Sequence, residues 1–151
     1  MRHTLPALAL VLFTAILAFP PSVQGAVPDP SAFVTRFYAW FFEADAGKTP
    51  AVMQDGILDY VHPKTVTYLR GPAYREPECY FTKANTCAAV WNTRTTHVGE
   101  PIPMRDKVFA VPVRFDLKEQ DYAESFHVIV WLHYTEAKLR IIRISDVYPH
   151  S

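Results

Sequence analysis

The fold is decided by residues 107–147, which read KVFAVPVRFDLKEQDYAESFHVIVWLHYTEAKLRIIRISDV. Three apolar runs, Val108–Leu117, Phe126–Tyr134 and Leu139–Val147, are separated here by polar segments. In the first two runs, β-branched and aromatic residues alternate with their neighbours, which predicts strands buried on one face. The short gap at Thr135–Lys138 predicts a tight hairpin, because parallel strands would need a long crossover. We therefore expect an antiparallel meander with one strongly apolar face.

The N-terminus predicts the compartment. A short basic start, Met1–His3, is followed by the uncharged run Leu5–Phe19, by Pro20–Pro21 and by small residues up to Gly25. This order is typical of a secretory signal peptide, which we assign to residues 1–25. The alternative is a membrane anchor, but an apolar run of about 15 residues is shorter than the roughly 20 that a spanning helix needs. We expect a periplasmic or secreted protein without a stable membrane anchor.

The mature chain, residues 26–151, has the usual size of one domain, at about 126 residues. Acidic and basic residues balance at 15 each and form no basic run, so nucleic acid is not an expected partner. Cys79 and Cys87 are most simply explained as one disulfide in an exported protein. The alternatives are two free thiols or metal ligation. Without a CxxC motif or a Cys/His cluster we expect neither zinc nor another cofactor.

Helices are predicted before the meander. Asp29 and Pro30 are an N-cap and a first helical residue, and a helix is expected from there to Gly47. Its aromatic stripe could be a cofactor site, but at helical spacing it is interpreted as core: Phe33, Phe37, Trp40 and Phe41. A second helix is expected from Pro50 to Val61, and a third from Pro63 to Leu69. Residues 71–89 are expected to be a loop, and residues 91–98 a strand. The fold class is therefore α+β, with helices packed on an antiparallel sheet of about four strands.

Several segments resemble a known family. They are FVTRFYAWF at residues 33–41, VGEPI at 98–102, KVFAVPVRF at 107–115 and KLRII at 138–142. Most of the mature chain resembles a family of small exported bacterial proteins classed as a domain of unknown function. Its fold is similar to that of nuclear transport factor 2, in which a curved sheet wraps round a long N-terminal helix into a cone. A Trp common near the start of the family's last strand is Leu139 here.

The resemblance implies a fold more than a function. Relatives of this fold include enzymes, ligand binders, dimerisation modules and immunity proteins that neutralise toxins. The family supplies no catalytic residues that could be carried over to this chain.

Few residues suggest chemistry. Asp59 and His62 are a candidate catalytic pair, since side chains three positions apart meet on a helix; the alternative is that His62 is a turn or cap residue. In-register pairing of the last hairpin puts Arg143 opposite Val130 on the inward face, where it could bind an anionic ligand. A bulge that turns Arg143 outward is the alternative. No metal site is predicted, because His127 and His133 lie about 20 Å apart along one strand.

The second face of the sheet is the candidate interface. The same in-register pairing puts His133 opposite Arg140, Trp131 opposite Ile142, Ile129 opposite Ile144 and His127 opposite Asp146. This predicts an apolar cluster with a polar rim, a pattern that marks protein interfaces. The predicted partner-binding residues are His127, Ile129, Trp131, His133, Arg140, Ile142 and Ile144. Coverage by the 71–89 loop or by the C-terminal tail is the alternative.

These patterns favour a non-enzymatic exported binding protein that acts through protein contacts, with another protein or a second copy as partner. An immunity protein against a secreted toxin is the most concrete version. The first alternative is a small-ligand carrier that uses the cone cavity with Arg143 as anchor. The second is a hydrolase or isomerase that uses Asp59 and a histidine.

Overall fold

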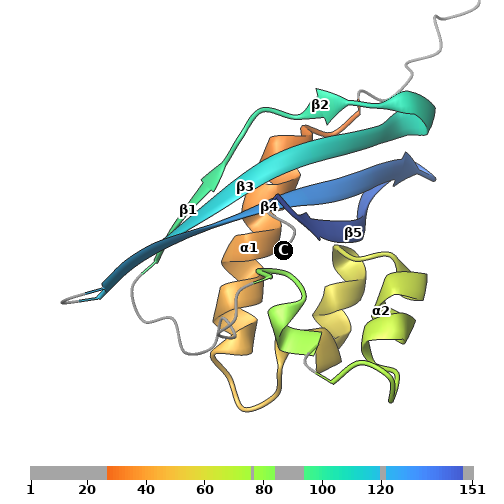
Figure 1. Ribbon diagram of the computed structural model, residues 1–151. Helices are drawn as coiled ribbons and strands as arrows, with labels where there is room; N and C mark the ends of the chain where they lie inside the picture. The colour runs from red at the N-terminus through yellow and green to blue at the C-terminus, as the bar shows by residue number, and fades with distance from the viewer. Residues whose placement is uncertain (1–26, 76, 84–93, 120–121, 148–151) are drawn as a thin grey trace, which may run out of the picture.

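The computed structural model describes residues 27–75, 77–83, 94–119 and 122–147 (Figure 1). The predicted signal peptide and Cys87 lie outside the described residues. Within the described ranges, no helix is long and apolar enough to cross a membrane.

The long helix α1 spans Pro30–Asp45, as its capping sequence predicts. The Asp29 carboxylate accepts hydrogen bonds from the backbone N–H groups of Ser31, at 2.9 Å, and Ala32, at 3.3 Å. These bonds satisfy two of the donors that a helix start leaves unpaired. The expected aromatic stripe is core, because Phe37 and Phe41 are fully buried.

The prediction of a second helix from Pro50 to Val61 is wrong. Residues 50–61 form two short 3₁₀ helices, η1 (Ala51–Met53) and η2 (Asp55–Asp59), separated by the extended residue Gln54. The Gln54 amide donates hydrogen bonds to the carbonyls of Ala44 and Thr49, at 2.9 and 2.8 Å, which fixes this break. A Cβ at Gly56 would lie 3.0 Å from the Trp40 ring, so tertiary packing overrides the helical spacing. The third predicted helix is present as α2 (Pro63–Leu69).

The sheet is antiparallel, with strand order β1-β3-β4-β5 and β2 paired to β3. Its strands are β1 (Arg94–Val98), β2 (Ile102–Pro103), β3 (Val108–Glu119), β4 (Tyr122–Thr135) and β5 (Lys138–Asp146). The fold class is therefore α+β, as predicted, with about five strands rather than about four. The short strand β2 was not predicted, because two residues are too few to show an alternating pattern. The hairpin turn is tight, since Glu136 and Ala137 both adopt positive φ values of 50° and 59°.

One face of the sheet, called the inner face, packs on α1, which crosses behind β3 and β4 in Figure 1. Phe81, from the predicted 71–89 loop, also enters this core, with its ring 5.2 Å from those of Phe37 and Phe41. A short 3₁₀ helix, η3 (Pro77–Cys79), precedes it. The opposite sheet face is called the outer face. The cone-like closure implied by the family resemblance stays a prediction.

Strand β5 carries a bulge that the in-register prediction did not contain. Leu132 pairs with Ile141 and Trp131 with Arg143, so Ile142 is the additional residue. The backbone of Ile141 is held from its other side, because its N–H donates to the Tyr60 carbonyl at 2.8 Å and its carbonyl accepts from the His62 N–H at 2.9 Å. The Thr65 hydroxyl donates to the Ile142 carbonyl at 3.0 Å. The bulge thus satisfies its backbone groups by pairing with the chain that leads into α2.

The bulge corrects four predictions. Trp131 pairs with Arg143 and not with Ile142. Arg143 is exposed and does not point inward, so the bulge alternative is confirmed. Ile144 pairs with Val130 and is only 3% exposed, so it belongs to the core rather than to the second face. Asp146 pairs with Val128 and not with His127. The predicted pair of His133 and Arg140 is confirmed, because it lies between the hairpin turn and the bulge.

Candidate functional site

The outer face carries the predicted interface residues with one exception. Along β4, half-exposed side chains alternate with the buried residues Val128, Val130 and Leu132. The half-exposed residues that belong to the predicted interface are His127, Ile129, Trp131 and His133 on β4, and Arg140 and Ile142 on β5. Ile144 is the exception. We call Ile129, Trp131, Ile142, Arg143 and Ser145 the outer patch.

The Trp131 ring is held in place by its neighbours on β5. Its indole N–H donates to the Ser145 hydroxyl oxygen at 2.9 Å, and the Arg143 guanidinium donates to the same oxygen at 3.0 Å. The guanidinium carbon lies 5.9 Å from the centre of the indole ring, within the range of a cation–π contact. The in-register pairing did not include Arg143 and Ser145 among the interface residues; the bulge, which was the alternative, brings both beside Trp131.

A polar cluster crosses β1, β3 and β4 further along the sheet. The Asp116 carboxylate contacts His97 Nε2 at 2.9 Å and Arg114 Nε at 3.1 Å, and accepts a hydrogen bond from the Ser125 hydroxyl at 2.7 Å. The Ser125 hydrogen bond, followed by the charges of Arg114 and His97, lowers the pKa of Asp116 although desolvation opposes the shift. These residues were not predicted as a group, although strand register alone brings them together.

A cavity of about 280 Å³ lies beside this cluster. Its lining includes three residues at one register position on neighbouring strands: His97, Arg114 and His127. This end of the sheet therefore offers polar and titratable groups next to the apolar part of the outer face.

The structure gives His62 a capping role and leaves Asp59 exposed. His62 is the N-cap of α2, where its Nδ1 accepts a hydrogen bond from the Lys64 N–H at 3.2 Å, so its predicted role as a cap is confirmed. Asp59 is exposed, and its backbone carbonyl accepts a hydrogen bond from the Arg140 guanidinium at 2.6 Å. Neither residue lines the cavities described here.

No metal site is seen in the part of the chain that the structure describes, where no group of three His, Cys, Asp or Glu residues could hold an ion. Cys79 ends η3 and is half-buried, while its predicted partner Cys87 lies outside the described residues. The disulfide between them stays a prediction.

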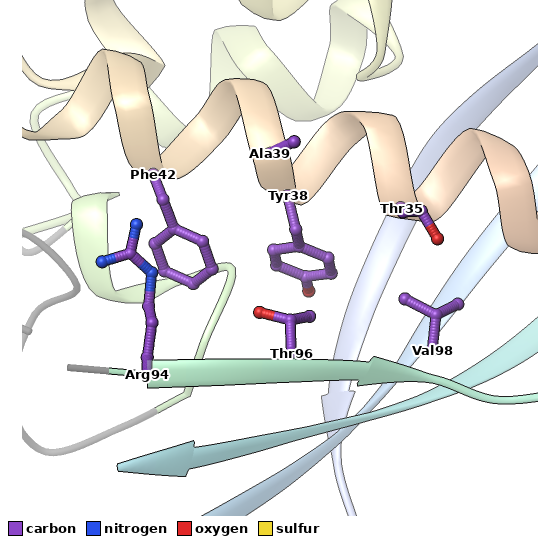
Figure 2. A pocket seen from close by; sticks show the side chains of 7 residues that line it. All are labelled: Thr35, Tyr38, Ala39, Phe42, Arg94, Thr96 and Val98. Atoms are coloured by element: carbon purple, nitrogen blue, oxygen red, sulfur yellow. The ribbon is translucent and has the colours of Figure 1, made fainter. Parts of the chain in front are cut away.

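A second cavity, of about 370 Å³, lies between α1 and β1 (Figure 2). Arg94 stands at one end of it, with its guanidinium carbon 3.9 Å from the centre of the Phe42 ring. Burial lowers the pKa of Arg94, as expected for a cation that is partly removed from water. Tyr38 forms part of the wall, and its hydroxyl donates to the Phe81 carbonyl at 2.8 Å.

Comparison with known proteins gives one informative result. No family model matches the chain, and no curated protein matches its sequence. One solved structure is similar to this chain. It is titled as the type VI native effector–immunity complex Tae3–Tai3 from Ralstonia pickettii, and a chain of it superposes with a TM-score of 0.63 at 28% identity. The match covers 82% of this chain and 98% of that chain.

This similarity extends over nearly the whole of the matched chain, so it concerns the complete fold rather than one motif. The assembly that contains the matched chain is a complex between two proteins, an effector and an immunity protein. The outer patch combines apolar side chains with the Trp131–Arg143 pair, and Trp and Arg are both enriched in protein interfaces.

Proposed function

We propose that this chain is an immunity protein of the periplasm, which binds a type VI effector and neutralises it by direct protein contact. The observation that carries the proposal is the match to a chain of the Tae3–Tai3 complex, over 98% of that chain. The predicted signal peptide supports the periplasm as the place of action. The arrangement of Asp59 and His62 supports a binding role over the predicted hydrolase or isomerase, because the cap bond already uses His62 Nδ1.

We further propose that the outer patch is the surface that binds the partner. Its apolar residues Ile129, Trp131 and Ile142 are half-exposed, and the polar side chains His133 and Arg140 flank them. An apolar centre with a polar rim is the usual arrangement of a protein interface. Trp and Arg are the residues most often found at energetic hot spots, and Ser145 orders both of them before binding.

The experiment uses the mature chain and a candidate effector from its own source genome, with binding measured by calorimetry. We expect Trp131→Asp to weaken binding by about thirtyfold or more, which corresponds to the roughly 2 kcal/mol of a hot spot. Tyr68→Asp is the matched control, because Tyr68 is 60% exposed on α2 and receives the same charge. The control should bind as tightly as the wild type.

Two results would contradict the proposal at different levels. If the wild-type chain neither binds the effector nor protects cells that express it in the periplasm, the function is wrong. If the chain binds and only Tyr68→Asp weakens binding, the function stands and the surface is wrong. The mass of the wild-type chain in solution shows whether a second copy occupies the patch, in which case Trp131→Asp converts a dimer to a monomer.

A further inference from the structure

The outer face of the sheet carries an excess of positive charge. Cross-strand register shows which side chains share this face, because they alternate with buried residues such as Val111 and Val113. With histidines counted as neutral, the described strands carry one acidic residue at these outward positions, Asp116. The basic residues at outward positions are Arg114, Lys118, Lys138, Arg140 and Arg143. Acidic and basic residues balance over the whole chain, so the excess is a property of this face.

The carboxylate of Asp116 does not offset this excess. It already contacts Arg114 Nε at 3.1 Å and His97 Nε2 at 2.9 Å, and it accepts a hydrogen bond from the Ser125 hydroxyl at 2.7 Å. Glu136 lies in the turn between β4 and β5, and its carboxylate also leaves the basic residues in excess. The charge that the face presents to a partner is therefore positive.

Four of the basic residues have no carboxylate partner among the described residues. Arg140 donates to a backbone carbonyl of η2 at 2.6 Å, and Arg143 donates to the Ser145 hydroxyl oxygen at 3.0 Å, so both bond to neutral oxygens. The side chains of Lys118 and Lys138 are exposed and form no ion pair within the described part of the chain. These charges face the solvent without a counter-charge of the molecule's own.

The basic residues lie at both ends of the apolar centre of the face. Arg114 pairs with His127 on β4, and Arg143 pairs with Trp131 on the same strand. These two positions on β4 are four residues apart, which is about 13 Å at roughly 3.3 Å per residue. Ile129 lies between them and is half-exposed. A complementary surface would have an apolar centre with a negative charge at each end.

A protein fits this arrangement better than a nucleic acid or an anionic membrane does. Basic residues that bind nucleic acid gather in a continuous patch or stripe, because phosphates follow one another at short intervals. Here an apolar segment interrupts the basic residues, and its Trp131 ring is held by a hydrogen bond to Ser145 at 2.9 Å. Protein interfaces combine such apolar centres with charged groups at the rim.

We propose that the outer face binds an acidic protein surface, in which Asp or Glu side chains flank an apolar centre, and that its basic residues accelerate association. Carboxylates of the partner contact Arg140 and Arg143 at one end and Arg114 at the other. Lys118 and Lys138 lie further out and attract the partner before contact. The proposal rests on the proposed function only where it takes this partner to be the effector.

A defined acidic polymer tests the charge preference without the effector. The probe is poly-L-glutamate, with poly-L-lysine as the polymer of opposite charge, and binding is followed through the amide signals of the ¹⁵N-labelled mature chain. We expect poly-L-glutamate to shift the signals of Trp131 and Arg143 at 0.1 M NaCl, and poly-L-lysine to leave both unchanged. Poly-L-glutamate that shifts neither signal would overturn the proposal.

The candidate effector tests the association step, measured by stopped-flow fluorescence. Raising NaCl from 0.1 to 1 M should slow association at least tenfold and change the dissociation rate less than threefold. The physical reason is that the screening length falls from about 10 Å to about 3 Å over this range, which removes attraction at a distance.

Two double variants separate the outer face from the overall charge. Lys118→Gln/Lys138→Gln should slow association with the effector at least threefold at 0.1 M NaCl, and the difference should disappear at 1 M. Arg36→Gln/Lys48→Gln is the matched control, because it removes two exposed cations in and just after α1, which packs on the inner face. The control should associate like the wild type. Thermal unfolding verifies that both variants are folded.

Association that is equally fast at both salt concentrations would overturn the proposal, as would equal slowing by the two double variants. Retention of the chain on phosphatidylglycerol vesicles or on duplex DNA at 0.15 M NaCl would overturn it too, since the face would then bind a membrane or a nucleic acid. If no candidate effector binds, the proposed function fails, and the poly-L-glutamate titration decides this proposal alone.

Discussion

Asp116 shows how single residues on this sheet act through their cross-strand neighbours. Its carboxylate accepts from Ser125 on β4, contacts His97 on β1 and contacts Arg114 on its own strand. The Ser125 hydrogen bond and the contacts with Arg114 and His97 lower its pKa in the folded protein. A carboxyl group with a lowered folded-state pKa stabilises the fold above its unfolded pKa, and this stabilisation is lost as the pH falls through the folded-state value.

We therefore expect Asp116→Asn to lower the thermal midpoint at pH 7. The decrease should be small, because the interactions of an exposed group are weak. The difference from the wild type should shrink as the pH falls from about 4 through the lowered folded-state pKa of Asp116, because the carboxyl group is protonated in both states only below that value. Thermal unfolding at a series of pH values measures this difference in thermal midpoint, with Asp55→Asn as the exposed control. A difference that grows in acid would show that the pKa of Asp116 is raised instead.

The bulged strand β5 decides which side chains the outer face presents. Because Ile142 is the additional residue, Arg143 stays beside Trp131 and Ile144 returns to the core opposite Val130. Ile141 exchanges backbone hydrogen bonds with Tyr60 and His62, and the Ile142 carbonyl accepts one from the Thr65 hydroxyl of α2. These bonds cover an edge of the sheet that would otherwise expose backbone donors and acceptors.

The register of β5 has a direct consequence for stability. Ile144→Ala should reduce the free energy of unfolding by about 2–5 kcal/mol, because Ile144 is 3% exposed and its removal leaves a cavity. Ile142→Ala, at a half-exposed position of the same strand, should cost about 1 kcal/mol. Urea denaturation of the two variants provides the comparison. If Ile142→Ala reduced the free energy of unfolding as much as Ile144→Ala or more, β5 would have the straight register without the bulge.

At the scale of the whole molecule, the segment between Pro77 and Lys83 joins the two layers. Phe81 packs against α1, and the Tyr80 hydroxyl accepts a hydrogen bond from the Ile144 N–H at 3.2 Å. Lys83 lies over the Tyr80 ring at 4.0 Å. The predicted disulfide from Cys79 would fix the chain next to these contacts.

We expect a Cys79–Cys87 disulfide that closes a loop of about nine residues. The chain-entropy model gives about 2.6 kcal/mol for a loop of this length. Its reduction should therefore lower the free energy of unfolding by up to that amount without unfolding the protein. Peptide mapping without reductant identifies the bond. Two alkylatable thiols in protein taken from its native compartment would reject it.

Export is the second prediction at this scale. A chain expressed in a Gram-negative host should appear in the periplasm with its mature N-terminus at Ala26 or close to it, because Gly25 ends the predicted signal peptide. Intact-mass measurement of the periplasmic protein identifies the cleavage site. A full-length chain that stays in the membrane fraction would favour the anchor alternative.

Much of the architecture follows from local sequence signals. The cap at Asp29–Pro30, the short helix from Pro63 and the three apolar runs of the meander predict α1, α2, β3, β4 and β5. These signals are sufficient because capping bonds and period-two alternation depend on residues that are close in the chain. The tight turn at Glu136–Ala137 is local for the same reason. The outer face as a surface of half-exposed apolar residues could likewise be predicted from the alternation along β4.

The tertiary structure alone decided the rest. The Gln54 amide donates hydrogen bonds to the Ala44 and Thr49 carbonyls at the break between η1 and η2, so the segment before Val61 is not one helix despite its helical spacing. The chain around Val61 pairs with β5 at Ile141, where the bulge begins, so Ile144 is core and Arg143 lies beside Trp131. Arg94 borders a cavity because α1 passes over β1, which are far apart in the sequence. Each of these features depends on contacts between distant segments, and a pattern of neighbouring residues carries no information about such contacts.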